Sequence, residues 1–194
     1  PPRSTPKPSS AASDVYKRQP INITLRTYRR VSKLPTIKLP DLLKCRYNNR
    51  EGFMKFEDAL PFLTKNHRGV IGTKQPNGSI HSSIVVCGIY ESMGAFVSVY
   101  PKSQKIKNLR RNPSCTILSV SDDWREYVTI EGEATLLDYN NTDPHILRPL
   151  LRNVYMACSE TKHPDWDEYD QAMVDQKAVI VTVNPEKVYG LLRT

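Results

Sequence analysis

Residues 102–113, KSQKIKNLRRNP, have the types and spacing that could bind an anion. They place five positive charges within ten residues, directly after the strand-like run AFVSVY. A helix that starts here would present free backbone N–H groups and the positive end of its dipole, which together bind phosphate or carboxylate. Lys105 would supply the counter-charge, and Asn108, one turn further on, a hydrogen-bond donor. A solvated basic helix face explains the same charges, so both interpretations stay open.

No second set of chemical groups stands out. The chain lacks the phosphate-binding loop, the dinucleotide-binding fingerprint and the serine-hydrolase elbow. Its four histidines and four cysteines are scattered without metal-ligand spacing, so no metal site is expected. The acidic run DWDEYD, residues 165–170, stands at the start of a predicted helix, where carboxylates complement the helix dipole. We therefore expect these carboxylates to be structural.

Composition narrows the class of protein. The chain has 194 residues, of which 39% are hydrophobic and 25% charged, as in a globular domain. Its net charge is +8, but residues 1–19 hold four basic side chains against one acidic one, which leaves +5 for the rest. This modest charge, with no aromatic residue between positions 101 and 123, argues against nucleic acid as a partner.

Compartment and domain boundaries follow from local composition. No apolar run approaches the roughly 18 residues of a membrane span, so no membrane partner is expected. Unpaired cysteine spacing favours a reducing, cytoplasmic compartment. Residues 1–19 are rich in Pro and Ser, look like translated sequencing adapter, and are predicted to be a disordered, non-native leader. We expect an extended lead-in over 20–52 and a single domain over 53–194.

The hydrophobic pattern predicts a mainly β fold. A hairpin spans 69–88 around Asn77-Gly78, and further strands are expected at 95–100, 114–120, 126–138 and 177–190. Helices are expected at 53–67, begun or kinked by Pro61, at 142–158 and at 163–173. In the helix within 102–113, Ile106 and Leu109 should pack inward, while Lys105 and Asn108 share another face. Six mostly antiparallel strands with peripheral helices describe a small β-barrel.

Three segments also resemble a known family. FLTKNHRGVIGT, K-x-K-N-L-R-R-N-P and YVTIEGEA are similar to the pyridoxamine 5'-phosphate oxidase-like FMN-binding split-barrel superfamily. HPDWDEYDQAMV, followed by an apolar strand and VYG, resembles its deazaflavin (coenzyme F-420)-dependent reductase branch. The resemblance runs from Phe56 to Gly190. It implies a six-stranded antiparallel Greek-key split barrel, and a homodimer with two cofactor sites at the subunit interface.

The resemblance also assigns roles to residues. It implies that Lys105 and Asn108 hold the cofactor phosphate, that Ser98 and Val99 line the site, and that Ser83 lies beside the ring. It extends the cofactor-binding set to Lys102, Gln104 and, from the partner subunit, Trp124. Ser103 stands where an arginine is usual, and Lys102 could replace that charge. An additional residue lies between Trp124 and Gly132, so either Trp124 or Tyr127 could be the contacting aromatic unless a bulge reconciles them.

This resemblance explains the missing catalytic side chains, because a deazaflavin or flavin carries the hydride chemistry itself. We expect an oxidoreductase that binds coenzyme F-420 and reduces a small unsaturated molecule, with Tyr127 as a candidate proton donor. FMN in the same fold, or a non-enzymatic flavin- or deazaflavin-binding protein, are the alternatives. Coenzyme F-420 would need a positive groove for its carboxylate tail, and the nearby residues Lys102, Lys107, Arg110 and Arg111 could form one.

Overall fold

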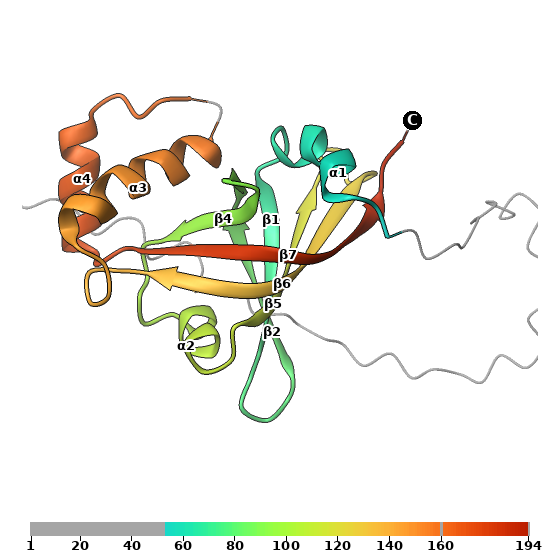
Figure 1. Cartoon of the computed structure of the whole chain (residues 1–194), viewed down its shortest axis with the longest axis horizontal. Coiled ribbons are helices and arrows are strands. Elements are labelled where there is room, and N and C mark those ends of the chain that lie inside the picture. Colours follow the sequence, from blue (N-terminus) through green and yellow to red (C-terminus); the bar gives the residue numbers. More distant parts are fainter. Residues whose placement is uncertain (1–52, 160, 194) are drawn as a thin grey trace, which may run out of the picture. The chain divides into compact units, whose positions relative to one another are not determined.

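The computed structural model describes residues 53–159 and 161–193, so the predictions for 1–19 and 20–52 lie outside it. The described residues form seven strands and four helices (Figure 1). The strands are β1 (Arg68–Lys74), β2 (Ile80–Val86), β3 (Gly88–Tyr90), β4 (Met93–Ser98), β5 (Ser114–Val120), β6 (Tyr127–Leu137) and β7 (Val179–Leu191). The helices are α1 (Phe56–Leu63), α2 (Gln104–Arg111), α3 (Pro144–Ala157) and α4 (Trp166–Asp175).

All seven strands belong to one curled antiparallel sheet in the order β2-β1-β5-β6-β7-β4-β3. Strands β5, β6 and β7 follow one another as neighbours, and the preceding strand β4 lies beside β7, which is a Greek-key arrangement. Helices α3 and α4 lie together at one end of β4 and β7, whereas α1 lies at the other end (Figure 1). The predicted mainly β split barrel with peripheral helices is confirmed.

The predicted strand count of six was wrong because β3 was missed. This strand has only three residues, which is too short for a period of two to be visible. Glu91 and Ser92 link it to β4 with φ values of 48° and 61°. Such two-residue turns usually contain Asn or Gly, which tolerate a positive φ, so Glu-Ser gives no hairpin signal. By contrast, the Asn77-Gly78 turn between β1 and β2 was predicted correctly, with Gly78 at φ 87°.

Two hydrophobic clusters cover the two faces of the β4–β7 region. The interior of the curled sheet is filled by side chains such as Ile71, Phe96 and Ile130, together with Ile106 and Leu109 from α2. A second cluster lies outside, where Leu147, Leu151 and Val154 of α3 pack with residues of α4, β4 and β7. Strand β4 and the first five residues of β7, 179–183, are therefore packed on both faces, which explains why these segments read as largely hydrophobic runs.

Helix boundaries follow the predicted signals in most places. Asp143 caps α3 by accepting a 2.7 Å hydrogen bond from the His145 backbone, and Pro144 is the first helical residue, as predicted. Helix α1 is shorter than expected, and Pro61 lies inside it rather than at its start. No helix among the residues described has both the length and the apolarity of a membrane span.

Three of the four cysteines lie in the described part of the chain, and all three are buried free thiols. Desolvation by burial raises the pKa of Cys87, Cys115 and Cys158 to about 12. A thiol with such a pKa is almost entirely protonated at neutral pH and is a poor nucleophile. These residues therefore act as small apolar side chains.

Candidate functional site

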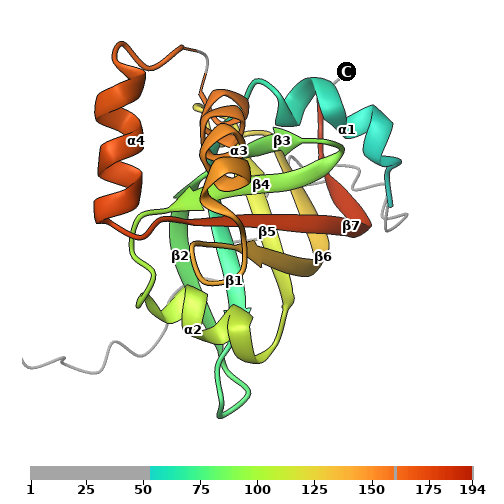
Figure 2. The same cartoon turned by 60° about the vertical axis from the view of Figure 1, so that its left-hand side comes forward.

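The predicted anion-binding stretch forms α2, which lies against β1 and β2 at the lower end of the barrel (Figure 2). The helix begins at Gln104, directly after Ser103, and its buried face contains Ile106 and Leu109 as predicted. Because these two apolar side chains enter the barrel interior, they hold α2 against the barrel, and residues 99–103 connect the helix to the end of β4. Ser98 is the last residue of that strand. This packing positions the helix N-terminus predicted to bind phosphate.

Asn108 was predicted to share a face of α2 with Lys105, apart from the inward face of Ile106 and Leu109. It is fully buried, and its amide nitrogen donates a 3.0 Å hydrogen bond to Thr73 Oγ1 on β1. Its amide oxygen accepts a 2.8 Å hydrogen bond from Gln104 Nε2. In this arrangement Asn108 joins α2 to β1 and fixes the side chain of Gln104. Direct contact between Asn108 and a phosphate stays a prediction.

Three buried hydroxyl groups near α2 have no hydrogen-bond partner among the described residues: Ser83 Oγ, Ser98 Oγ and Ser103 Oγ. Ser83 lies on the inward face of β2, opposite Ile71 of β1. Ser103 is the N-cap residue of α2, yet its side chain makes no capping hydrogen bond. A buried hydroxyl without a partner costs roughly 1–3 kcal/mol, so native proteins rarely keep one without a reason such as a ligand.

Lys105 provides the charge beside these hydroxyl groups. It lies in the first turn of α2, and partial burial lowers the pKa of its ammonium group. Desolvation has this effect because it disfavours the charged form of the side chain. An anion bound at the helix N-terminus would compensate that cost. The first turn of α2, with Lys105 and the Ser103 hydroxyl, therefore has the groups to hold a ligand phosphate, whereas Ser83 and Ser98 are buried on β2 and β4.

Ser98 and Val99 are neighbours in sequence but point to opposite faces of the sheet. Ser98 is buried on the α2 side, whereas Val99 packs against the outer cluster formed with α3 and α4. Val99 lines an apolar cavity of about 360 Å³, together with Val86, Val97, Tyr155, Tyr169 and Met173. This size is within the range of small-molecule sites. The structure thus separates the polar site at the first turn of α2, formed by Ser103 and Lys105 and called the α2 seat below, from an apolar cavity on the other side of β4.

The two predicted aromatic contacts are not brought to α2 within one chain. Trp124 lies in the loop between β5 and β6, and β5 begins near α2 but ends at this loop. Trp124 is 79% exposed and has a φ of 61°, which is unusual for a bulky residue. Tyr127 begins β6 at the same end of the barrel. Contact between either side chain and a cofactor would have to be made in another subunit.

The bulge that could have reconciled these two residues is elsewhere. The register between β6 and β7 shifts at Glu131/Gly132, where successive partners are Lys187 and Pro185. The additional residue is therefore in β7, and β6 pairs with β5 without interruption. At Gly132 a Cβ atom would lie 1.9 Å from the Asn184 carbonyl oxygen, so only glycine fits. The structure leaves Trp124 and Tyr127 as alternatives.

The basic residues of the stretch do not form one continuous groove, and Lys107 lies on the exposed side of α2, outside the cavity that Lys102 and Arg110 line. Arg111 donates a hydrogen bond to the backbone carbonyl of Lys74 at the end of β1. Arg110 forms an ion pair with Asp138, whose side chain is only 3% exposed. Arg110 and Lys102 nevertheless line one hollow of about 570 Å³, whose wall also includes Lys177 from the end of α4. Two of the four predicted groove residues therefore share a cavity.

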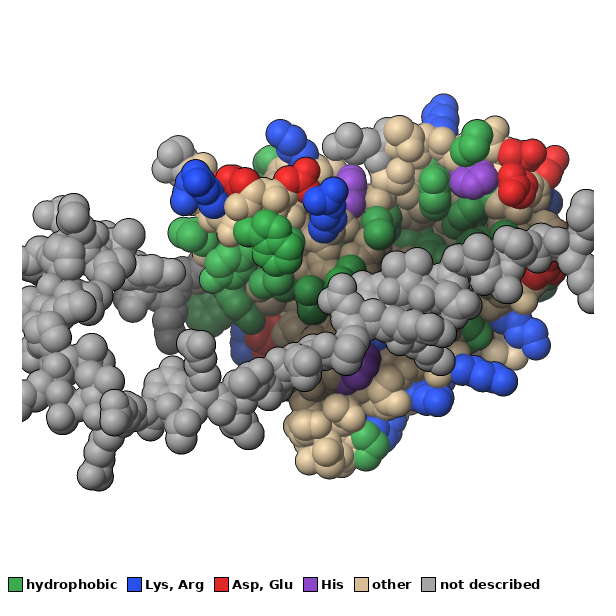
Figure 3. All heavy atoms as spheres, turned by 180° about the vertical axis from the view of Figure 1, so that it is seen from behind, with side chains coloured by type: hydrophobic (Ala, Val, Ile, Leu, Met, Phe, Trp, Pro, Cys, Tyr) green, Lys and Arg blue, Asp and Glu red, His purple; other side chains and the backbone are tan. Residues whose placement is uncertain are grey.

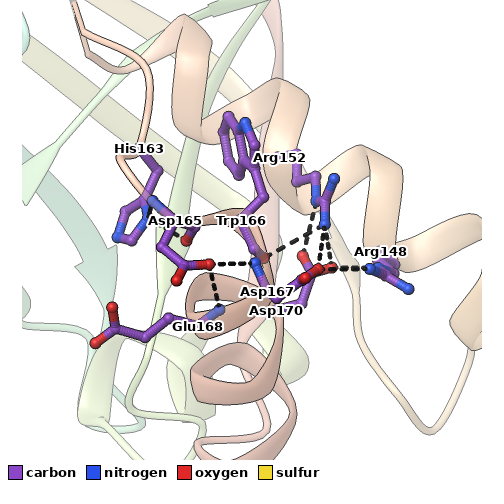
Figure 4. Close-up of polar contacts among 8 residues, drawn as sticks. All are labelled: Arg148, Arg152, His163, Asp165, Trp166, Asp167, Glu168 and Asp170. Atoms are coloured by element: carbon purple, nitrogen blue, oxygen red, sulfur yellow. Dashed lines mark hydrogen bonds and ion pairs between the residues drawn. The ribbon is translucent and has the colours of Figure 1, made fainter.

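The acidic run at 165–170 is structural, as predicted (Figure 4). Asp165 caps α4 by accepting hydrogen bonds from the backbone N–H groups of Asp167 and Glu168, at 2.9 and 3.1 Å. Asp170 instead binds Arg148 and Arg152 of α3. Arg152 also lies over the Trp166 ring, 5.2 Å from its centroid. These contacts dock α4 on α3 and engage the carboxylates of Asp165 and Asp170 in the fold.

Sequence reasoning missed two polar residues at or next to the α2 seat. Nδ1 of His81 is buried and has no partner among the described residues. His81 faces Thr73, the residue to which Asn108 is bonded, and it shares the inward face of β2 with Ser83. The period of two along the strand from Ser83 could have indicated it. Ser103 was noted only for lacking the charge of an arginine, although it precedes the helix as an N-cap serine would.

Comparison with known proteins agrees with this architecture. A family model described as pyridoxamine 5'-phosphate oxidase matches residues 56–192. A conserved hypothetical protein from Mycobacterium tuberculosis has a TM-score of 0.58 at 19% identity, over 75% of this chain and 93% of that chain. A putative 5-nitroimidazole antibiotic resistance protein from Bacteroides thetaiotaomicron has a TM-score of 0.51 at 14% identity, over 72% of this chain and 88% of that chain. A putative pyridoxamine 5'-phosphate oxidase from Listeria innocua has a TM-score of 0.50 at 19% identity, over 70% of this chain and 97% of that chain. Because the family model covers most of the chain, the protein belongs to the pyridoxamine 5'-phosphate oxidase family.

Proposed function

We propose that the protein is an oxidoreductase that binds coenzyme F-420 and passes a hydride to a small unsaturated organic molecule. The observation that carries this proposal is the buried, unpartnered hydroxyl group of the N-cap Ser103, at the first turn of α2 that also holds Lys105. A phosphate at this position would satisfy donors that the protein itself leaves unpaired. Family membership supports a flavin-like ligand, because the fold is the one expected from the sequence resemblance.

Each residue near the seat has a distinct task in this proposal. Lys105 and the α2 backbone N–H groups neutralise the ligand phosphate, while Ser98 and Ser103 donate hydrogen bonds to it. Asn108 and Gln104 hold α2 against β1 and so fix the position of Lys105. Coenzyme F-420, when bound, supplies the hydride, so the protein needs only to orient the reacting groups and exclude water. The apolar cavity beside Val99 could receive an uncharged ring.

The choice between coenzyme F-420 and FMN rests on the resemblance at 163–190 and on charge. FMN carries one phosphate, which the α2 seat could neutralise alone. Coenzyme F-420 adds a tail of carboxylates, and basic side chains gather on the side that carries α2 and the C-terminal end of α4 (Figure 3). Exposed attractions are screened over ~10 Å at 0.1 M salt, so a ligand held by several charges should lose more affinity as salt rises.

Titration of the purified protein with each cofactor, followed by absorption spectroscopy, tests this choice. Coenzyme F-420 should bind more tightly than FMN, and its affinity should fall more steeply between low and high salt. Equal salt dependence with FMN as the tighter ligand would replace the deazaflavin with the flavin. Binding without turnover across a panel of unsaturated acceptors would favour a non-enzymatic binding protein.

A homodimer is part of the proposal because the site is incomplete in one chain. Trp124 and Tyr127 lie at the barrel end away from α2, so a partner subunit would have to bring one of them to the cofactor. The outer face of β2 offers a surface for this contact, since Ile80, Ile84 and Val86 are 64%, 83% and 62% exposed. Ile84 and Val86 are adjacent on the outer face of this edge strand, and Ser82 separates them from Ile80; exposed apolar surface of this kind marks interaction sites.

Light scattering on the full chain tests the dimer. We expect a mass near twice 22.2 kDa, and a shift toward the single-chain mass in Ile84→Lys, which places a charge in the centre of the stripe. Cofactor affinity should fall together with the dimer. A wild-type mass near 22.2 kDa with full cofactor affinity would exclude a shared site.

A further inference from the structure

We propose that the hollow between α2 and the end of α4 is a second anion site, which binds carboxylate or phosphate groups through Lys102, Arg110 and Lys177. The hollow has a volume of about 570 Å³, and Tyr139 and Val174 complete its wall. Lys102 and Arg110 come from the stretch around α2, whereas Lys177 is far away in sequence and was not part of any predicted site. The fold thus brings Lys177 into the same hollow as Lys102 and Arg110, the two groove residues predicted from the sequence.

The backbone at Lys177 is the second observation. Helix α4 ends in a Schellman motif, in which Lys177 N donates to the Val174 carbonyl and Ala178 N to the Met173 carbonyl, both at 3.0 Å. Lys177 occupies the left-handed position of this motif, with a φ of 50°. Glycine is the usual residue here because it has no Cβ to clash. A lysine in this conformation carries a backbone cost that glycine would avoid, and this cost motivates a test of its side chain.

The charges in the hollow leave it positive. Asp138 is its acidic residue, and that buried carboxylate is already bound to Arg110, which fixes the guanidinium group in the wall. Lys102 and Lys177 form no ion pair with any residue in the described ranges 53–159 and 161–193. A lysine at a helix C-terminus also complements the helix dipole, which requires no ligand. Measurement of anion binding separates these two explanations.

Two sources could supply the anion, and the first rests on the proposed function. The hollow begins at Pro101 and Lys102, directly before the N-cap Ser103, so a ligand with its phosphate at α2 could extend a carboxylate tail into it. The second source is a separate anionic molecule that binds without the cofactor. In both cases the recognised chemistry is the same, namely carboxylate or phosphate oxygens held by ammonium and guanidinium groups.

The experiment compares Lys177→Gly with Lys177→Arg and with Lys107→Ala, which removes the same charge from the exposed side of α2. Calorimetric titrations use coenzyme F-420, FMN and triglutamate as probes. Lys177→Gly relieves the left-handed strain, so its melting temperature should not fall, and a loss of binding cannot be attributed to unfolding. We expect its affinity for the anion to fall about fivefold, the size of one partly exposed ion pair. Lys177→Arg and Lys107→Ala should stay near wild type.

The probes identify the source. Weaker binding of coenzyme F-420 with unchanged FMN binding assigns the hollow to the tail, whereas weaker binding of triglutamate alone assigns it to a separate anion. If the wild type binds neither cofactor, the proposed function fails, and triglutamate binding alone then shows whether the hollow is an anion site. The inference is overturned if Lys177→Gly binds every probe as tightly as the wild type does.

Discussion

Helices α2 and α4 both begin with polar residues, but only α4 has its N-terminal N–H groups capped by a side chain. At α4 the N-cap Asp165 accepts two backbone hydrogen bonds, and Asp170 is held by two arginines. At α2 the N-cap Ser103 makes no capping bond, and its hydroxyl is buried without a partner among the described residues. Polar or charged residues at a helix start can therefore serve the fold or be left without a partner, and only the tertiary structure distinguishes the two cases.

The largest stability effect is expected where α4 docks on α3. Asp170→Asn removes the negative charge that Arg148 and Arg152 share, and should lower the free energy of unfolding by about 2 kcal/mol. Chemical denaturation at pH 7 measures this loss. Asp167→Asn is the matched control, because that carboxylate is 93% exposed and lies 3.6 and 3.8 Å from the same arginines. If both variants lose equal stability, Asp170 is not the anchor of α4.

The pH dependence of the same contact has a definite sign. The hydrogen bond from Arg152, followed by that from Arg148, holds the pKa of Asp170 below its ordinary value of 3.8. A depressed pKa means that the contribution is complete above pH 3.8 and is lost as the pH falls through the lower, folded-state value. The stability difference between wild type and Asp170→Asn should therefore be constant near neutrality and shrink below about pH 4. A difference that grows in acid contradicts this assignment.

The two N-caps provide a smaller and more direct contrast. Asp165→Ala removes two hydrogen bonds to backbone N–H groups, so its melting temperature should fall, though less than that of Asp170→Asn. Ser103→Ala removes no capping bond and should leave the melting temperature of the free protein unchanged. The same Ser103→Ala variant should bind the cofactor more weakly. Equal losses of stability in the two variants would mean that Ser103 is an ordinary cap.

The smallest effects are expected from single hydroxyl groups, and they should differ in sign. Tyr169 donates a 3.1 Å hydrogen bond to the Leu151 carbonyl, so Tyr169→Phe should cost about 1 kcal/mol. Ser98→Ala removes a buried hydroxyl with no described partner and should be neutral or stabilise the free protein by up to about 1 kcal/mol. Thermal unfolding without cofactor compares the two. A destabilised Ser98→Ala would show that this hydroxyl has a partner in the free protein.

The sequence was sufficient to predict most of the fold because its signals there are local. The Asp143-Pro144 start of α3, the Asn77-Gly78 turn and the inward packing of Ile106 and Leu109 each follow from a few adjacent residues. The Glu91-Ser92 turn was missed because its residue types do not predict a positive φ. Local patterns fail where the chain adopts a conformation that other parts of the structure impose.

The candidate site was less predictable because it depends on distant parts of the chain. Helical spacing placed Asn108 with Lys105, but Thr73 of β1 offers a buried hydroxyl to which its amide binds. Helical spacing predicts which residues share a face of a helix, but it does not predict which polar groups of a neighbouring strand that face will meet. Lys177 likewise lines the same hollow as Lys102 only because of the way α4 and β7, which flank it in sequence, pack in the fold. Neither contact could be inferred without the tertiary structure.

The central claim is that the first turn of α2 is the seat of a cofactor phosphate, and calorimetric titration of two lysine variants tests it most directly. Lys105→Ala should weaken binding of coenzyme F-420 and of FMN by about 1.5–3 kcal/mol, tenfold or more, because it removes a charge-assisted hydrogen bond. Lys107→Ala, on the exposed side of the same helix, should bind both cofactors nearly as the wild type does. Unchanged melting temperatures in both variants will show that folding is intact. Unchanged affinity in Lys105→Ala, or an equal loss in both variants, would contradict the account.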